Sequence, residues 1–418
     1  MKKLLLFLTV NICLGSLCAQ VHFVCATNGI DTNLKQEDLY SDERGYGFSP
    51  VGGSSNALLF SSKLKEGNYK VSVTVLSSKK DNGISVKVEN RRLMLLNQPL
   101  RKNKKETFSF LVHVRDSLIH GTKQQIRLKL RERSYPHWDN KLTLEIYGKD
   151  IVLKNIQIDT VSYSVPTIFL AGNSTVVDQP YEPWAAWGQM LPCMLRSDSV
   201  IVANYAESGE TIKAFVRENR LKKIFSLAKP GDYLFVEFAH NDQKKGGNHL
   251  EPFTSYKDSL KSWVVQARER KLIPVLVTSI SRRNFGEDGK IVNTLGDYPE
   301  AMRQVARELN AVLIDLNAMT TQMYEAWGAE KSTKAFVHFP ANTFPGQQKE
   351  LKDNTHFTSF GAYEVAKCVA TKLAHSDLGV GSFVLPQYRV FDPSQPDSFS
   401  DVPIPMSPIN EVRKPDGN

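Results

Sequence analysis

Cysteine is scarce in this sequence, and no long apolar run is present. Two of its five cysteines fall in an amino-terminal segment that reads as a leader, which leaves Cys25, Cys193 and Cys368. An odd number without short-range pairs indicates neither a disulfide framework nor a cysteine metal site. The apolar run from Leu4 to Val10 is too short to cross a bilayer about 30 Å thick. Hydrophobic and charged contents of 41% and 23% exclude the disordered and multispanning classes.

The amino terminus predicts a cleaved secretory signal over residues 1–19. A basic start, the apolar run and small residues before Ala19 give the three-part layout of such a signal. Leu17 is large where a lipoprotein carries a small residue, so cleavage is favoured over a lipid anchor at Cys18. We therefore expect a periplasmic or secreted protein without a membrane span.

The charge balance is basic, with a formal net charge of +9. A basic protein suits a polyanionic partner. Because an exported protein meets polysaccharide rather than nucleic acid, we expect an acidic polysaccharide such as pectin as the partner and no nucleic acid.

Residues 20–160 predict an antiparallel β-sandwich, the first of two domains that a chain of 418 residues can hold. Apolar and polar residues alternate here with the period of half-buried strands, and turn-rich stretches separate the runs. The runs are Tyr69 to Val75, Ile84 to Val88, Phe108 to Val114, Ile126 to Leu130 and Leu142 to Ile146. Many short alternating runs of this kind are typical of a sandwich.

Residues 165–380 predict a three-layer α/β/α domain with a parallel sheet, because short continuous apolar strands alternate with amphipathic helical stretches. The expected strands are Ile168 to Ala171, Val200 to Ala203, Tyr233 to Phe238, Pro274 to Val277 and Val312 to Asp315. The expected helices are Tyr256 to Arg270, Pro299 to Leu309 and Phe360 to Leu373. Residues 385–418 are too rich in proline for regular elements, so an extended or disordered tail is expected.

A serine follows the first of these parallel strands. The strand ends at Gly172, and Ser174 stands at its carboxyl end, where open α/β sheets bind ligands. By itself such a serine is more often a helix N-cap than a nucleophile. The G-x-S-x-G turn of α/β-hydrolases is absent, which disfavours that family.

An acid and a histidine stand three residues apart before the last predicted helix. If Asp353 lies on the same side of a turn as His356, its carboxylate can hold the Nδ1 proton of the imidazole. Nε2 is then left to take the serine proton. The pair alone is also common on surfaces and in metal sites. Together with Ser174 it predicts a catalytic triad.

Two further blocks follow their own strands. The backbone N–H of Gly209 and the side-chain amide of Asn241 would join the N–H of Ser174 around one oxyanion. Singly, Gly209 is explained by a turn into a helix and Asn241 by a capping role. Because all the blocks fall at one edge of one sheet, we interpret them jointly as an active site.

These blocks resemble the SGNH (GDSL-like) hydrolases. Ser174, Gly209, Asn241 and His356 match, in order, the four residues that give the family its name, and Asp353 matches its triad acid. Two departures are visible. Asn173 stands where the family usually has aspartate, and an amide can keep the hydrogen bonds to loop N–H groups. Ala239 stands where the family usually has glycine, which is tolerable only at a negative φ.

More narrowly, residues 167–373 are similar to rhamnogalacturonan and pectin acetylesterases, and the front of the chain resembles the galactose-binding-like domain that precedes such esterases. The runs that carry this likeness include Trp184 to Met190, Asn204 to Thr211 and Arg44 to Phe48. The resemblance implies deacetylation of pectic polysaccharide through an acyl-enzyme, with no cofactor. As possible metal ligands, His240, His249, His338 and Asp242 have no standard spacing, so no metal is expected.

Basic residues flank the predicted site. Lys244 follows the Asn241 block, and Arg282 and Arg283 follow the strand that ends at Val277, so all three are expected to bind a substrate carboxylate. Solvated basic loops are the competing interpretation. The alternatives for function are an SGNH esterase acting on acetylated xylan or other esters, and a pectin-binding protein with a degenerate hydrolase fold.

Overall fold

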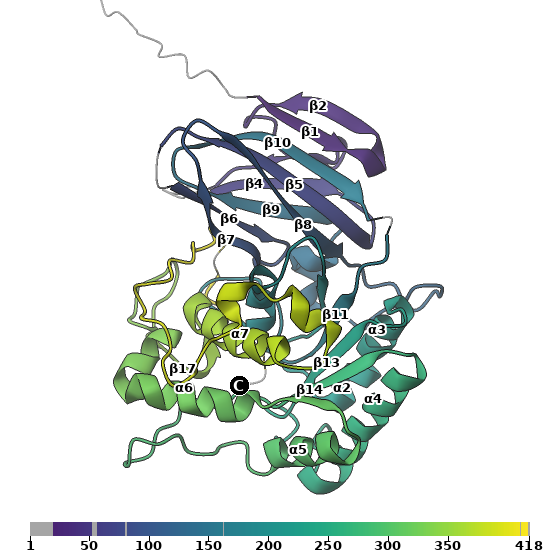
Figure 1. Cartoon of the computed structure of the whole chain (residues 1–418), viewed down its shortest axis with the longest axis vertical. Coiled ribbons are helices and arrows are strands. Elements are labelled where there is room, and N and C mark those ends of the chain that lie inside the picture. Colours follow the sequence, from purple (N-terminus) through teal and green to yellow (C-terminus); the bar gives the residue numbers. More distant parts are fainter. Residues whose placement is uncertain (1–19, 52–56, 80–81, 162, 410, 417–418) are drawn as a thin grey trace, which may run out of the picture.

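The computed structural model of the chain describes residues 20–51, 57–79, 82–161, 163–409 and 411–416 (Figure 1). The predicted signal over residues 1–19 lies outside the described residues. No helix in the described ranges is long and apolar enough to cross a membrane. Cys25, Cys193 and Cys368 are all buried as free thiols.

The front of the chain forms two five-stranded sheets around one apolar core. One sheet has the order β2-β1-β10-β5-β8 and the other the order β3-β4-β9-β6-β7, and all neighbours are antiparallel except β1 and β10. The strands are β1 (Val21–Cys25), β2 (Ile30–Leu34), β3 (Tyr46–Ser49), β4 (Ala57–Lys63), β5 (Gly67–Ser77), β6 (Asn82–Val88), β7 (Arg92–Leu100), β8 (Lys105–Val114), β9 (Lys141–Tyr147) and β10 (Ile151–Thr160). Val71, Val86 and Phe110 are among the side chains that fill the space between the sheets. The arrangement is that of a β-sandwich.

One predicted strand of this region is wrong. The segment from Ile126 to Leu130 forms no strand, and the 3-10 turn Leu130–Ser134 follows it. Ile126 packs into the core of the second region, whereas Leu130 at the end of the segment is 82% exposed. The alternating pattern therefore reflects contact with the second region and not a strand. The N–H of Arg127 donates to the backbone oxygen of Glu218, so this segment bonds to the second region instead of to a neighbouring strand.

The second region has a parallel sheet of order β12-β11-β13-β14-β15. Its strands are β11 (Thr167–Gly172), β12 (Ile201–Asn204), β13 (Tyr233–Glu237), β14 (Ile273–Val277) and β15 (Val312–Ile314). The helices are α1 (Trp187–Met190), α2 (Ile212–Arg217), α3 (Arg220–Leu227), α4 (Lys257–Glu269), α5 (Tyr298–Glu308), α6 (Leu316–Lys331) and α7 (Ser359–Ala374). A hairpin of β16 (Phe336–Phe339) and β17 (Leu351–Phe357) precedes α7.

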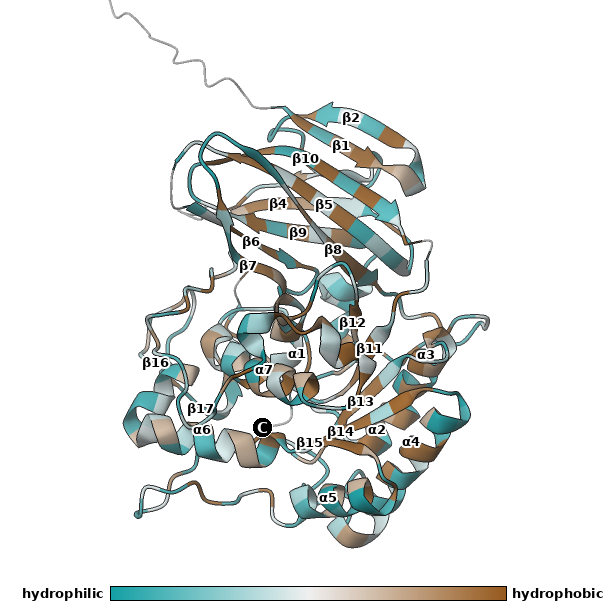
Figure 2. Cartoon of the chain, in the orientation of Figure 1, coloured by the Kyte–Doolittle hydropathy of each residue, from teal (hydrophilic) through white to brown (hydrophobic). Residues whose placement is uncertain are grey.

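Alternate residues of the interior strand β11 point into two different cores. Ile168 and Leu170 pack with residues of α1, α6 and α7, whereas Phe169 and Ala171 pack with residues of α2 to α5. In Figure 2 the parallel strands are hydrophobic along their length, and the sandwich strands alternate. A sheet buried on both faces requires this difference. The predicted fold class, an α/β/α sheet preceded by antiparallel sheets, is confirmed.

After α7 the chain runs back across the molecule without long elements. The 3-10 turn Pro386–Tyr388 is followed by no helix or strand in residues 389–409 and 411–416. Lys87, on the sandwich strand β6, donates from Nζ to the backbone oxygen of Pro405 at 2.6 Å. This last stretch therefore contacts both regions.

Candidate active site

A glycine turn delivers Ser174 at the end of β11. A Cβ on Gly172 would lie 2.6 Å from a methyl group of Val176, so only glycine fits there. Asn173 Oδ1 accepts a hydrogen bond from the backbone N–H of Thr175 at 3.1 Å and lies 2.9 Å from the Thr175 hydroxyl oxygen. The amide thus makes the loop bonds expected of the aspartate that it replaces.

Ser174, His356 and Asp353 form one chain of hydrogen bonds. The Ser174 Oγ lies 2.8 Å from His356 Nε2, and His356 Nδ1 lies 2.8 Å from Asp353 Oδ2. With the Nδ1 proton on the side of Asp353, Nε2 accepts the serine hydroxyl, as a general base requires. All three side chains are buried, and Ser174 is 4% exposed. The structure therefore brings together the three residues predicted as a triad.

The carboxyl group of Asp353 is held in its charged form. Burial opposes the charge, but the His356 ring and the backbone N–H groups of His356 and Thr355 outweigh it and lower the pKa of Asp353 below its ordinary value. The two N–H groups donate to Oδ1 at 3.0 and 2.9 Å. A carboxylate so bonded stays ionised and fixes the orientation of the imidazole.

Asp353 and His356 lie on a bulged strand instead of the turn that their spacing suggested. In the β16–β17 pair, Phe336 faces Phe357 and His338 faces Lys352, so residues 353–356 lie between two consecutive pairs of the ladder. Such extra residues leave the ladder and re-aim their side chains. The bulge directs both functional side chains to the edge where β11 ends.

The predicted oxyanion residues follow β12 and β13. Gly209 has a φ of +78°, a conformation that favours glycine. The Nδ2 of Asn241 donates to the Glu210 oxygen at 3.1 Å, and its Oδ1 accepts from Lys244 Nζ at 3.0 Å. These bonds fix the direction of the amide and leave its second hydrogen for an oxyanion. Ala239 is not among the described residues with positive φ, so its methyl is accommodated.

Arg282 and Arg283, predicted to bind substrate, are hydrogen-bonded to neighbouring segments of the fold. Arg282 Nη1 lies 3.2 Å from the Thr294 hydroxyl, and its Nη2 lies 3.4 Å from the backbone oxygen of His240. The guanidinium group of Arg283 donates to Ser332, Asn354 and Ala329. Arg282 therefore links two loops beside the site, Arg283 links the end of α6 to β17, and Lys244 is the exposed member of the predicted group.

A turn of the sandwich, residues 89–92, supports the loop that follows Ser174. Arg92 donates from Nε and Nη2 to Asp178 Oδ2 at 2.9 and 2.7 Å. Arg91 donates to the Trp184 oxygen from both Nη atoms at 3.0 Å. Arg91 and Arg92 are buried, so both charges are paired away from water. No local sequence pattern marks this role, because the turn lies more than eighty residues before the loop that it supports.

Glu237, at the end of β13, is a second residue that the sequence patterns did not single out. Its carboxylate accepts from the Thr175 hydroxyl at 2.7 Å and from the indole N–H of Trp187 at 2.5 Å. Burial raises the pKa of Glu237 to about 7 against these two hydrogen bonds. Glu237 therefore links the turn that carries Ser174 to α1, through its bonds to Thr175 and Trp187.

The histidines that are possible metal ligands by residue type lie in separate surroundings. His249 bonds to the Asp242 backbone and to Glu251, whereas His338 bonds to Asn354. Burial lowers the pKa of His240 well below its ordinary value, which keeps this ring neutral. Within the described part of the chain, no group of three or more His, Cys, Asp or Glu side chains is arranged to hold a metal ion.

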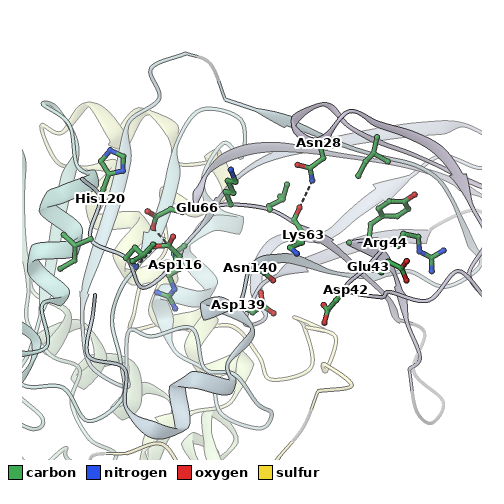
Figure 3. Close-up of a pocket in the computed structure, with 18 of the residues that line it drawn as sticks. Asn28, Asp42, Glu43, Arg44, Lys63, Glu66, Asp116, His120, Asp139 and Asn140 are labelled. Atoms are coloured by element: carbon green, nitrogen blue, oxygen red, sulfur yellow. Dashed lines mark hydrogen bonds between the residues drawn. The ribbon is translucent and has the colours of Figure 1, made fainter. Parts of the chain in front are cut away.

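A cavity of about 940 Å³ lies in the front region, away from the triad (Figure 3). Its lining includes Arg44, Lys63 and Asp139 but none of the triad residues. Glu66 and Asp116 on its wall are ion-paired with Lys223 at 2.5 and 3.0 Å. The charges of this cavity are thus partly neutralised within the fold, and it shares no residue with the candidate chemistry.

Comparison with known proteins places the matched region over this site. Residues 170–359 match the GDSL-like Lipase/Acylhydrolase family. Rhamnogalacturonan acetylesterase RhgT of Bacillus subtilis (strain 168) is 46% identical over 205 residues, which are 49% of this chain and 87% of that protein. The probable rhamnogalacturonan acetylesterase YesY of the same strain is 38% identical over 208 residues, 49% of this chain and 90% of its own length. The crystal structure of the Bacillus subtilis protein YxiM covers 85% of this chain and 98% of its own, with 20% identity and a TM-score of 0.46.

Proposed function

The chain belongs to the GDSL-like lipase/acylhydrolase family and is a carboxylic ester hydrolase, and we propose that it removes acetyl groups from pectic polysaccharide. The observation that carries the proposal is the hydrogen-bonded chain Ser174–His356–Asp353, in a region 46% identical to a named rhamnogalacturonan acetylesterase. An intact triad supports an enzyme over a degenerate binding protein, since binding alone needs no such chain.

The proposed reaction proceeds in two steps through an acetyl-enzyme. Ser174 Oγ attacks the acetyl carbonyl carbon while His356 Nε2 takes the hydroxyl proton, and Asp353 stabilises the resulting imidazolium. The bond from the acetyl carbon to the sugar oxygen then breaks, and His356 returns the proton to that oxygen. Water repeats the sequence on acetyl-Ser174, so that acetate leaves and the serine is restored.

The developing negative charge is expected to be stabilised by the N–H groups of Ser174 and Gly209 and by the amide of Asn241. Preorganised donors of this kind act on the transition state more than on the bound ester. Lys244 contributes by donating a hydrogen bond to the Asn241 side-chain oxygen, so that the amide nitrogen points toward the loop that contains Gly209 and Glu210.

We also propose a periplasmic or secreted location. The support is the signal-like layout of residues 1–19, together with a polysaccharide substrate that is met outside the cytoplasm. Fractionation of cells that express the full chain would test this, because retention of activity in the cytoplasm with an uncleaved amino terminus contradicts it.

Acetate release measured side by side tests the substrate. We expect the wild-type protein to deacetylate acetylated rhamnogalacturonan or homogalacturonan faster than acetylated xylan, and Ser174→Ala serves as the blank for spontaneous hydrolysis. Faster release from xylan would instead support the xylan esterase. Folded protein that releases no acetate from any of these polymers, yet binds pectin, would support the degenerate binding protein.

A further inference from the structure

Residues 403–409 and 411–416, here together called the carboxy-terminal strap, are anchored along the loop that follows the nucleophile. The Ser407 N–H donates to Glu182 Oε1 at 3.0 Å, and the Glu182 N–H donates to the Ile409 oxygen at 3.3 Å. Glu182 is itself buried and ion-paired with Arg91 at 3.2 Å. The strap is therefore fixed to the same loop that the sandwich turn supports.

A second anchor of the strap lies further along the chain, beside Gly209. Pro415 is buried and lines a small hollow together with Gln179 and Trp184. Asp416 Oδ1 is 2.9 Å from Arg131 Nη1, and a Cβ built on Gly209 would be 3.0 Å from Asp416 Cβ. The strap thus runs from the loop that follows Ser174 to Gly209, the glycine of the predicted oxyanion hole.

Lys414 lies next to this second anchor and reaches the triad. Its Nζ is 3.8 Å from Asp353 Oδ2, and its side chain is 50% exposed, so the ammonium group borders both the triad and solvent. Asp353 already accepts a shorter hydrogen bond from His356, at 2.8 Å. The charge of Lys414 is accordingly only partly neutralised within the described fold.

Lys244 carries a second positive charge at the same edge. Its Nζ is bonded to the neutral oxygen of Asn241, not to a carboxylate. Partial burial of the ammonium group lowers the pKa of Lys244, and the positive charges of Arg282 and Lys414 lower it further, so these cations lie within each other's field. Positive charges gathered beside a reacting centre attract an anionic ligand.

We propose that Lys414, carried by the strap, binds a carboxylate of the substrate together with Lys244 and so directs the esterase to acetyl groups on acidic chains. This rests on the proposed function and names the residue that gives it its preference for acidic polysaccharide. The strap lies outside residues 170–359, so the preference is added from outside the region that matches the family. Arg282 and Arg283 retain the hydrogen bonds to neighbouring segments described above.

The test compares an acidic polymer with a small neutral ester. The kcat/KM for acetylated pectin and for 4-nitrophenyl acetate is measured for wild type, Lys414→Met and Lys414→Arg, and the ratio of the two values is the readout. We expect Lys414→Met to lower the ratio about fivefold, mainly through KM, as for a solvent-bordered ion pair. Lys414→Arg should restore most of the ratio, and added salt should reduce it in wild type but little in Lys414→Met.

Lys245→Met is the matched control. Lys245 is on the same loop as Lys244, but its ammonium group is 3.6 Å from Glu251 and its side chain is 84% exposed. Its loss should change neither substrate's kcat/KM. An unchanged ratio in Lys414→Met, in an enzyme that deacetylates pectin, would overturn the inference. An equal fall on both substrates would assign Lys414 to the triad and also overturn it. Wild type inactive on pectin but active on the neutral ester would remove the proposed function, and the inference with it.

Discussion

The reacting groups of the active site all come from one segment of the chain, whereas the groups that support them come partly from outside that segment. Ser174 and Asn241 follow strands, and His356 lies on β17, all within the segment 170–359 that matches the family. Glu237 and Lys244 support them from within that segment, and two further supports come from outside it: the sandwich turn at residues 89–92 and the strap. Parallel strand ends can present the chemistry alone. The comparison suggests that the flanking regions supply rigidity and substrate preference.

Loss of a triad residue should have the largest effect. Ser174→Ala and His356→Ala should abolish acetate release, and Asp353→Asn should lower kcat about 10⁴-fold through the wrong imidazole tautomer. Each variant should stay folded, as a thermal melt would check. Turnover within a few fold of wild type in any of the three would mean that another pair carries the reaction.

A change in the sandwich turn should come next. Arg92→Met leaves the Asp178 carboxylate buried without its cation, and removal of one partner of a buried pair costs about 3–5 kcal/mol of unfolding free energy. Urea unfolding measures this loss. Arg101→Met, which removes an exposed pair with Glu106, is the control and should change little. Equal losses in the two variants would show that the front region does not support the nucleophile loop.

Asn241→Ala should act on the rate alone. Loss of one oxyanion donor is expected to lower kcat about 10²- to 10³-fold with little change in KM, because the donor acts on developing charge. Steady-state kinetics on a soluble acetyl ester separates the two constants. A change confined to KM would instead make Asn241 a substrate-binding residue.

The smallest expected effect is on pH dependence and concerns Glu237. Burial raises its pKa in the folded protein to about 7, above the ordinary value near 4.3. The stability that this group contributes is therefore complete below about pH 4 and is lost as pH rises through about 7. Urea unfolding at pH 5 and pH 8 should show a smaller difference for Glu237→Gln than for wild type. An identical difference in the two proteins would rule out Glu237 as its source.

Local patterns were sufficient for most of the fold and for the reacting groups. The strand from Ile168 to Ala171 is apolar because both its faces are buried, and that placed Ser174 at its end. The same kind of pattern failed from Ile126 to Leu130, where alternation reflects contact with the second region. No local sequence pattern marks residues such as Arg92 and Lys414, since their partners are brought near only by the folded chain.

Labelling with a serine-reactive phosphonate tests the central claim most directly. The hydrogen bond of 2.8 Å from Ser174 to His356 predicts an activated hydroxyl, so one adduct per chain should form, on the peptide that contains Ser174. Acetate release should fall in proportion to the fraction labelled, and Ser174→Ala should take up no label. An adduct on another residue, or full labelling of Ser174 with acetate release unchanged, would contradict Ser174 as the nucleophile.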